Sequence, residues 1–241
     1  MEKFNALDKQ QRIRYSRTLL IPDFNEENQL RLLNSNVLIV GAGALGSIVS
    51  MYLAASGIGN ITVADFDDID LSNLQRQLSF TTADIGHSKA EITATKLLEI
   101  NPEINVSPMV KLINRDDCKN IFPDYDLIIE GSDNPSTKYM VADACVKLGK
   151  KYVLGGISTT NGQLMSYMPG CASYRDWFPE QGCGNGFTPC SVGGVLGPVP
   201  GVIGSLMATE AIKILADIGS PLFNRLFCMD TLTMQTNVFV Y

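Results

Sequence analysis

The sequence has little positive charge, and it lacks any stripe in which basic and aromatic side chains alternate. Nineteen lysines and arginines stand against 25 aspartates and glutamates, which gives a net charge of −6. Nucleic-acid binding requires a basic patch that neutralises backbone phosphates. We therefore expect no polynucleotide partner.

Signals for export, membrane insertion and disulfide bonding are also lacking. The first residues, MEKFNALDKQ, do not show the charged, then apolar, then small pattern of a signal peptide. The longest apolar run, residues 199–216, is interrupted by Glu210 and Lys213. Six cysteines in 241 residues are too few for a disulfide framework. We expect a soluble cytoplasmic protein without a membrane partner.

The apolar content is sufficient for one large α/β domain spanning residues 1–241. Hydrophobic residues make up 45% of the chain, which excludes a disordered or fibrous protein. Strands are predicted at 36–40, 60–66, near Val106, 126–132 and 151–156, separated by helices that begin near residues 44, 88 and 136. This alternation predicts a Rossmann-like, mostly parallel sheet with helices on both faces.

Both ends of the chain depart from this alternation. Residues 1–33 have apolar positions at helical spacing, broken near Pro22, and are predicted to form a helical arm. Residues 169–200 are rich in Gly, Pro and Cys and follow a short strand at 163–168, which predicts a long crossover loop of the kind that covers a binding site. A helix at 201–216 and antiparallel strands at about 225–229 and 233–240 are predicted to close the domain.

A glycine motif follows the first predicted strand. Gly41, Gly43 and Gly46, with Ala44 between them, permit a tight turn and a close approach of backbone to phosphate at a helix N-terminus. Asp65 ends the next strand, where a carboxylate can hold ribose hydroxyls. This spacing also fits a nicotinamide or flavin enzyme, or a plain tight turn.

A polar cluster directly beyond Asp65 favours a triphosphate. The segment DFDDIDLSNLQRQLSF places amide and guanidinium donors close together at Asn73, Gln75, Arg76 and Gln77. Such donors neutralise charge at an α-phosphate and on departing pyrophosphate, and Arg76 is the best candidate for that role. Lys89 is either a phosphate ligand or a solvated helix lysine.

A carboxylate follows the predicted strand DLIIE. Asp133 in EGSDN stands at a carboxyl strand end, where open α/β sheets bind ligands. Its oxygens can bind magnesium. An N-cap role for Asp133 is equally compatible with the residue type.

Together these segments resemble the ThiF/MoeB/HesA family of ubiquitin-activating-like adenylyltransferases. The resemblance extends from Arg14 to about Met234 and rests on RYSR, VLIVGAGALGS, ADFDDIDLSNLQRQ, GHSK, SDN and GVLGPVPGVIGSLMATEAIKIL. It implies adenylation, with ATP and Mg²⁺, of the C-terminal Gly-Gly carboxylate of a ubiquitin-like sulfur carrier of the ThiS or MoaD type. Pyrophosphate is released, and sulfur transfer in thiamine, molybdopterin or related cofactor biosynthesis would follow.

The resemblance also implies roles for individual residues. Asp65 would bind ribose, Asp133 would place magnesium, and Arg17 would reach the triphosphate from the partner subunit of a homodimer. Phosphates would be held by Asn73, Arg76 and Lys89, and the further nucleotide-binding candidates are Asp67, Gln77 and Asn134. Ala44 departs from the family, where glycine is common, so the loop is expected to sit slightly differently over the nucleotide.

The cysteines depart further from the family. Two CxxC pairs normally hold a structural zinc there, whereas this sequence has no CxxC: Ser173 and Asp176 align with the first pair, and no second pair precedes the end of the sequence. Cys171 and Cys183 lack further soft ligands, and His87 is interpreted as an ordinary loop residue. We predict no zinc.

Cys190, just before GVLGP, matches the cysteine that in ThiF-like members attacks the adenylate or joins a sulfur intermediate. The alternative is a small residue of the crossover loop. A sulfur donor protein is a further expected partner if the cysteine is reactive.

Three other functions remain compatible with the sequence. The carboxylate could belong to a ribosomal peptide precursor or to another ubiquitin-like modifier. An NAD-dependent oxidoreductase would share the glycine turn but would not explain Arg76 or Asp133. A catalytically silent scaffold would fit the missing zinc cysteines, although retention of Arg17, Arg76, Lys89 and Asp133 argues against it.

Overall fold

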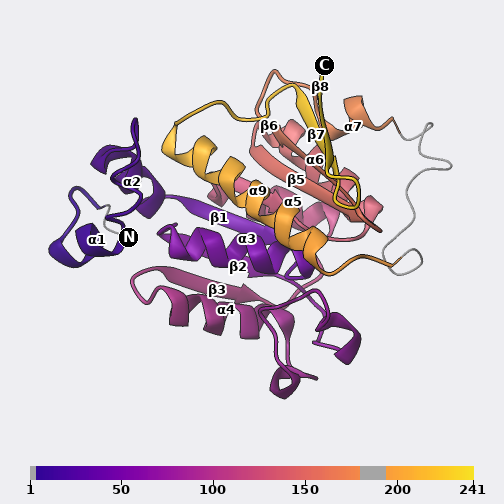
Figure 1. Ribbon diagram of the computed structural model, residues 1–241, viewed down its shortest axis with the longest axis horizontal. Helices are drawn as coiled ribbons and strands as arrows, with labels where there is room; N and C mark the ends of the chain where they lie inside the picture. Colours follow the sequence, from indigo (N-terminus) through magenta and orange to yellow (C-terminus); the bar gives the residue numbers. More distant parts are fainter. Residues whose placement is uncertain (1–3, 180–193) are drawn as a thin grey trace.

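The computed structural model describes residues 4–179 and 194–241, which form one eight-stranded sheet with the order β3-β2-β1-β4-β5-β6-β7-β8 (Figure 1). The strands are β1(Asn36–Val40), β2(Asn60–Ala64), β3(Asn105–Met109), β4(Leu127–Glu130), β5(Lys151–Ser158), β6(Asn161–Tyr167), β7(Arg225–Asp230) and β8(Gln235–Val240). Neighbouring strands are parallel from β3 through β2, β1 and β4 to β5, and they are antiparallel from β5 through β6 and β7 to β8. This confirms the predicted mostly parallel sheet with an antiparallel C-terminal extension.

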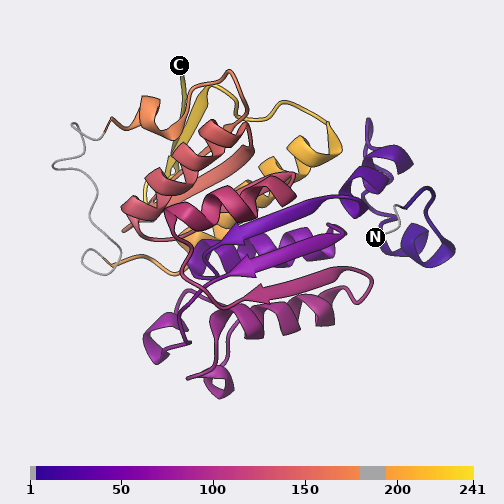
Figure 2. The same cartoon turned by 180° about the vertical axis from the view of Figure 1, so that it is seen from behind.

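Helices cover both faces of the sheet, as expected for strands that are apolar at successive positions. The described helices are α1(Lys9–Arg14), α2(Glu26–Leu33), α3(Ala44–Ala55), α4(Lys89–Ile100), α5(Arg115–Ile121), α6(Pro135–Leu148), α7(Tyr174–Trp177) and α9(Pro198–Ala216). Val37 and Ile39 of β1 join the core beneath α3 and α9, whereas Leu38 and Val40 join the core beneath α5 and α6. Figures 1 and 2 show these two layers from opposite sides.

The predicted crossover region, 169–200, contains more regular structure than its composition suggested. Residues 174–177 form α7, because the Ser173 side chain and the Asp176 side chain cap each other's backbone N–H groups. The last helix begins at Pro198 rather than at residue 201, since proline is well suited to the first turn of a helix.

Helix α9 is long and apolar enough to cross a membrane by length and composition alone. In the structure it packs against α3, β5 and β6, with Ile203, Met207 and Ala211 buried. Its buried Glu210 accepts hydrogen bonds from Ser166 Oγ at 2.8 Å and from the Leu222 N–H at 2.7 Å. It is a core helix of this fold.

The strand order reverses between β1 and β4. The chain runs outward from β1 to β3 on one side and from β4 to β8 on the other. A crevice therefore opens at the carboxyl ends of β1 and β4, where open α/β sheets bind ligands. The N-terminal arm with α1 and α2 lies at the opposite, amino end of β1 (Figure 1).

Candidate functional site

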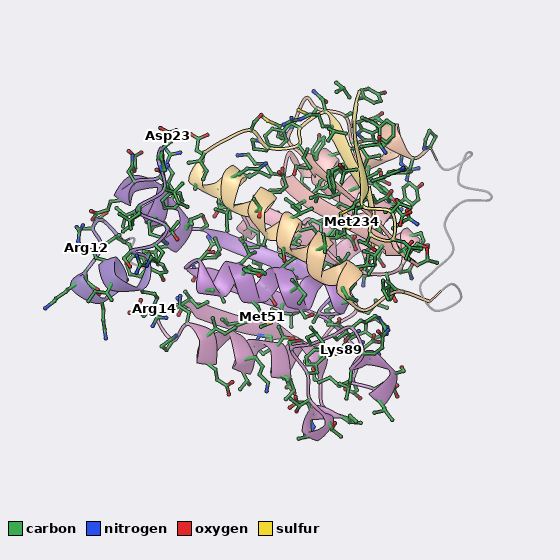
Figure 3. All side chains as sticks on the ribbon, viewed as in Figure 1. Arg12, Arg14, Asp23, Met51, Lys89 and Met234 are labelled. Atoms are coloured by element: carbon green, nitrogen blue, oxygen red, sulfur yellow. The ribbon has the colours of Figure 1, made fainter. Side chains whose placement is uncertain are left out.

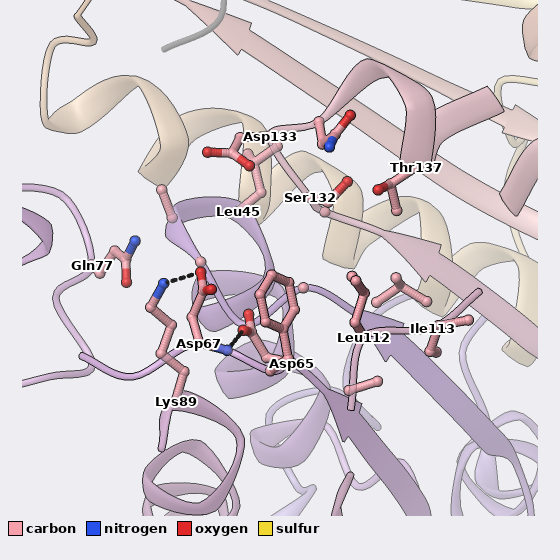
Figure 4. A pocket seen from close by; sticks show the side chains of 18 of the residues that line it. Leu45, Asp65, Asp67, Gln77, Lys89, Leu112, Ile113, Ser132, Asp133 and Thr137 are labelled. Carbon is pink, nitrogen blue, oxygen red and sulfur yellow. Dashed lines mark hydrogen bonds and ion pairs between the residues drawn. The ribbon is translucent and has the colours of Figure 1, made fainter. Parts of the chain in front are cut away.

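A cleft of about 380 Å³ lies at the carboxyl ends of β1, β2 and β4 (Figure 4). It brings together most of the residues predicted to bind nucleotide: Gly41, Gly43, Ala44, Asp65, Asp67, Asn73, Arg76, Gln77, Lys89, Asp133 and Asn134. These residues come from five separate segments of the chain. The cleft is therefore a product of the fold and not of a single motif.

The glycine turn forms one wall of the cleft. Gly41 has a φ of 91°, and a Cβ built on it would lie 3.0 Å from the Ser132 nitrogen. A Cβ on Gly46, which stands behind the wall, would overlap the Gly41 carbonyl. Gly43 is the N-cap of α3 and supplies no side-chain cap, so N–H groups of the first helical turn are available to a phosphate.

Asp65 lies directly beneath this turn. Its carboxylate accepts hydrogen bonds from the Ala42 N–H at 2.7 Å and from the Asp67 N–H at 2.8 Å. Burial raises the pKa of Asp65, and the two backbone N–H groups partly oppose that shift. Each carboxylate oxygen has a second lone pair, so the group remains able to accept hydrogen bonds from ribose hydroxyls.

Lys89 is a buried cation at the edge of the cleft. Its side chain is only 8% exposed, and Nζ lies 2.8 Å from Asp67 Oδ2, whose side chain is 48% exposed. The interpretation of Lys89 as a solvated helix lysine is therefore wrong: the turn after β2 folds over the first residue of α4. An ammonium held in this way acts at a site with little competing water, where electrostatic interactions are stronger.

The cluster after β2 lines the cleft as well, and its Gln77 lies on the same side of the cleft as Lys89 (Figure 4). Arg76 donates one hydrogen bond, from Nη1 to the Ser72 carbonyl at 2.9 Å. Gln77 is 4% exposed, and its Oε1 has no hydrogen-bond partner in the described part of the chain. A buried amide oxygen without a partner is costly.

Asp133 has a free carboxylate. It is exposed at the mouth of the cleft and makes no hydrogen bond or ion pair within residues 4–179 and 194–241. The N-cap of α6 is Asn134, which accepts a hydrogen bond from the Ser136 N–H at 2.8 Å. The N-cap alternative for Asp133 is therefore wrong, whereas the side-chain oxygen of Asn134 is committed to that cap.

A buried ion pair beneath the cleft was missed from the sequence. Glu130 and Lys138 are 0% and 1% exposed at their side chains, and Nζ lies 2.6 Å from Glu130 Oε2. Burial raises the pKa of Glu130, against the opposing effects of Lys138 and Ser132. The available signal was a glutamate that ends an otherwise apolar strand, because such a charge requires a buried partner.

An apolar wall beyond β3 was also missed. Leu112 and Ile113 lie in the cleft on the other side of Asp65 from Lys89 (Figure 4), together with Phe66. Across the cleft, the apolar wall, the Asp65 carboxylate and the cationic edge at Lys89 therefore follow one another in space. This order matches the base, sugar and phosphates of a nucleotide.

Arg17 does not line the cleft. Arg17 belongs to the arm between α1 and α2, and Figure 3 shows Arg14 of the same arm far from Lys89. Cys183 and Cys190 lie outside the described residues. Arg14 itself contacts Glu103 at 3.4 Å.

The positions aligned with a first zinc pair carry the helix cap of α7. Ser173 Oγ donates to Asp176 Oδ2 at 2.7 Å. Within the described residues, no group of three or more His, Cys, Asp or Glu side chains is arranged to hold a metal ion. His87 lies in a loop, with Nδ1 at 3.3 Å from the Asp84 carbonyl.

The chain is similar to known proteins over nearly its whole length. The model of the ThiF family matches residues 15–240. The chain is 41% identical over 240 residues to the probable adenylyltransferase/sulfurtransferase MoeZ of Mycobacterium tuberculosis, covering 98% of this chain and 61% of that protein. It is 41% identical to the adenylyltransferase and sulfurtransferase MOCS3 of Arabidopsis thaliana, covering 97% and 51%. The chain thus spans between half and two thirds of the length of these relatives.

Solved structures share the fold. The crystal structure of E. coli MccB with AMPCPP and MccA superposes with a TM-score of 0.80 at 28% identity, covering 94% of this chain and 71% of MccB. A second crystal structure of E. coli MccB contains ATP and superposes with a TM-score of 0.81.

Proposed function

This chain belongs to the ThiF family, and from that premise we propose that it uses ATP to adenylate the C-terminal carboxylate of a small protein. The observation that carries the proposal is the cleft, where the glycine turn, Asp65, Arg76, Lys89 and Asp133 meet. The shape of this cleft accounts for nucleotide binding, and its charges account for the chemistry.

In the proposed reaction, a carboxylate oxygen of the substrate attacks the α-phosphorus of ATP. The bond to the oxygen that bridges the α- and β-phosphates breaks, and its electron pair leaves with pyrophosphate. Negative charge builds on the departing group, so preorganised cations nearby lower the barrier. Among the cations that line the cleft, Arg76 and Lys89 would act on the phosphates, and Asp65 would fix the ribose.

Magnesium is expected to assist this step. Asp133 presents a free carboxylate at the mouth of the cleft, and Mg²⁺ is commonly held by one or two carboxylates together with substrate phosphates. When bound, the ion would neutralise phosphate charge and orient the leaving group. Asp133 would hold it.

The substrate we favour is the Gly-Gly tail of a ubiquitin-like sulfur carrier. A second cleft of about 670 Å³ runs along β5, β6 and β7, and Ile157 lines both clefts. An extended tail could follow this path from the antiparallel strands to the nucleotide. The relatives at 41% identity are named as adenylyltransferases and sulfurtransferases, and a 42% identical relative from Porphyra purpurea is named a probable molybdopterin-synthase adenylyltransferase. These names support a sulfur carrier of cofactor biosynthesis, and the pathway we propose is that of molybdopterin, thiamine or a related cofactor.

A ribosomal peptide precursor is the second candidate substrate. It is supported by the MccB structures, one of which contains MccA beside AMPCPP, although their identity of 28% is lower than that of the sulfurtransferase relatives. Both substrates present a carboxylate to the same nucleotide. We propose that the reaction takes place in the cytoplasm. After adenylation, the Cys190 thiolate would attack the acyl-adenylate, forming a thioester as AMP leaves.

Carrier-dependent exchange of radiolabelled pyrophosphate into ATP tests the function. Purified protein should catalyse exchange with a Gly-Gly-ending carrier and lose it when the last glycine is deleted. Calorimetric titration should show binding of ATP and no comparable binding of NAD. Tight NAD binding without exchange would refute the proposal in favour of an oxidoreductase, whereas exchange with a peptide precursor alone would change the substrate.

Arg17 would act in the cleft of a second copy of the chain. The arm lies at the amino end of β1 and the cleft at its carboxyl end, so Arg17 is badly placed for the cleft of its own chain. Arg17→Ala and Arg76→Ala should each lose exchange. Mixing equal amounts of the two inactive chains should restore up to about a quarter of the activity, because about half of the dimers are then mixed and one of the two sites in each mixed dimer is intact. No recovery in a mixture shown to contain mixed dimers would remove Arg17 from the site.

A further inference from the structure

The buried ammonium of Lys138 has all of its hydrogen-bonding capacity used by the protein. Nζ lies 2.6 Å from Glu130 Oε2, 2.7 Å from the Ser132 carbonyl and 2.7 Å from the Gly155 carbonyl. An ammonium has three protons, so none remains for a ligand. Lys138 lines the nucleotide cleft without being able to bind a phosphate in this arrangement.

The three acceptors belong to three different parts of the site. Glu130 ends β4, Ser132 lies in the turn before Asp133, and Gly155 lies in β5. Glu130 Oε1 accepts from the Ser132 N–H at 3.0 Å and from Ser132 Oγ. The peptide units on both sides of Ser132 are therefore held, one through its N–H and the other through its carbonyl.

This clamped turn is also wedged against the glycine loop. A Cβ on Gly41 would lie 3.0 Å from the Ser132 nitrogen, so the two backbones are nearly in contact. Asp133 follows the held Ser132 carbonyl directly. The carboxylate of Asp133 is free, but the backbone that carries this side chain has little room to move.

The Gly155 carbonyl extends the same clamp toward the second cleft. Gly156, Ile157 and Ser158 follow Gly155 along β5, and all three line that cleft. One ammonium therefore fixes the separation between the turn that carries Asp133 and the strand along which a substrate tail would approach.

We propose that Lys138 is a positioning residue. By holding the Ser132 and Gly155 carbonyls together, it keeps Asp133 at a fixed separation from the path of the substrate tail. This inference rests on the proposed function. Lys138 does not touch the nucleotide in this role. It sets where the Asp133 carboxylate, which would hold the metal, stands relative to the attacking carboxylate of the substrate. Small displacements of reacting groups have large effects on rate.

Two combined substitutions, E130Q/K138M, test this role. The amide at position 130 can still accept from the Ser132 N–H, and both charges are removed together, so no uncompensated charge is left in the core. The Ser132 and Gly155 carbonyls lose their shared donor. A matched control is E210Q/K213M, which neutralises a second ion pair with a buried glutamate, on α9 and outside both clefts.

The expected result is a split between kcat and KM. In carrier-dependent pyrophosphate exchange, kcat for E130Q/K138M should fall about 10- to 100-fold, as for other groups that orient a metal ligand. KM for ATP should stay nearly unchanged, since Asp65, Arg76 and Lys89 lie on other segments. The control pair should lower thermal stability without changing kcat. Equal kcat in both double variants, measured well below their melting temperatures, would overturn the proposal.

A double-mutant cycle with Asp133→Asn distinguishes positioning from general damage. If Lys138 acts through Asp133, adding Asp133→Asn to E130Q/K138M should give no more loss than Asp133→Asn alone. Fully multiplicative losses would contradict the inference.

A readout without turnover separates this inference from the proposed function. Hydrogen exchange of the free protein, followed by mass spectrometry, should be faster in the 131–134 segment of E130Q/K138M and unchanged there in E210Q/K213M. Unchanged exchange in this segment would overturn the clamp even if the wild-type chain were an active adenylyltransferase. Faster exchange with an inactive wild-type chain would instead leave the clamp in place and refute the function.

Discussion

The sharpest expectation for the site concerns Lys89→Met, which removes the ammonium but keeps an unbranched side chain of similar length. Lys89 is 8% exposed, so its charge acts on bound phosphates with little screening by water. Removing one preorganised group that stabilises developing charge costs about 100- to 1,000-fold in kcat, or about 2.7–4 kcal/mol of transition-state stabilisation. We expect the loss in pyrophosphate exchange to fall in that range.

The effect on folding should be small by comparison. Asp67, the partner of Lys89, is 48% exposed, so the carboxylate left behind is solvated. A pair of this kind contributes at most about 1 kcal/mol, and for a chain of this size that corresponds to a change in Tm of about 2–4 °C. Activity and stability should therefore separate.

Lys96→Met is the matched control. Lys96 lies on the same helix, is 31% exposed and faces an aspartate, Asp84, at 3.9 Å, but it does not line the cleft. Its loss should leave exchange unchanged. If Lys89→Met kept exchange within about a factor of three of wild type, or if both lysine variants lost activity equally, Lys89 would not be the cation that stabilises the departing phosphates.

Three further outcomes follow from the structure. Gly46→Ala should abolish ATP binding and destabilise the fold by about 1–3 kcal/mol in denaturant unfolding, because the added Cβ overlaps the Gly41 carbonyl; a stable variant that binds ATP normally would contradict the turn geometry. Burial raises the pKa of the Cys118 thiol to about 11, so at pH 8 only about one thiol in a thousand is ionised; iodoacetamide should modify Cys118 only after unfolding, and rapid labelling of the native protein would disagree with its burial. Cys190→Ala should keep carrier adenylation and lose any covalent carrier adduct seen by mass spectrometry, since activation of a carboxylate requires no thiol; an unchanged adduct would remove Cys190 from the mechanism.

Much of the fold could be predicted because its signals are local. NVLIV and LIIE are apolar at successive positions, which marks strands buried on both faces, and the glycine motif marks the turn between β1 and α3. Helix α5 was missed, because Arg115–Ile121 is short and mostly polar. Because Cys118 is the single buried residue of α5, the segment has no apolar periodicity from which a helix could be predicted.

The residues of the candidate site likewise fall into two groups: those that motifs predict, and those that only the packing of the fold brings together. Residues in motifs, such as Asp65 and Arg76, were predicted and do line the cleft. The clamp made by Glu130 and Lys138 was not predicted, since two charges eight positions apart resemble a strand end and an exposed helix position. Only the packing of α6 against β4 and β5 buries them together. The cap at Asn134 rather than Asp133 depends on where α6 begins, and helix boundaries are poorly defined by sequence.

The most direct measurement is the intact mass of a Gly-Gly-ending carrier after incubation with this protein, ATP and Mg²⁺, with rapid acid quenching. We expect a carrier heavier by one adenylyl group at its C-terminal glycine, formed by the wild-type chain and not by Lys89→Met. A carrier of unchanged mass, under conditions where ATP is bound in the cleft, would contradict the claim that this cleft activates a carboxylate.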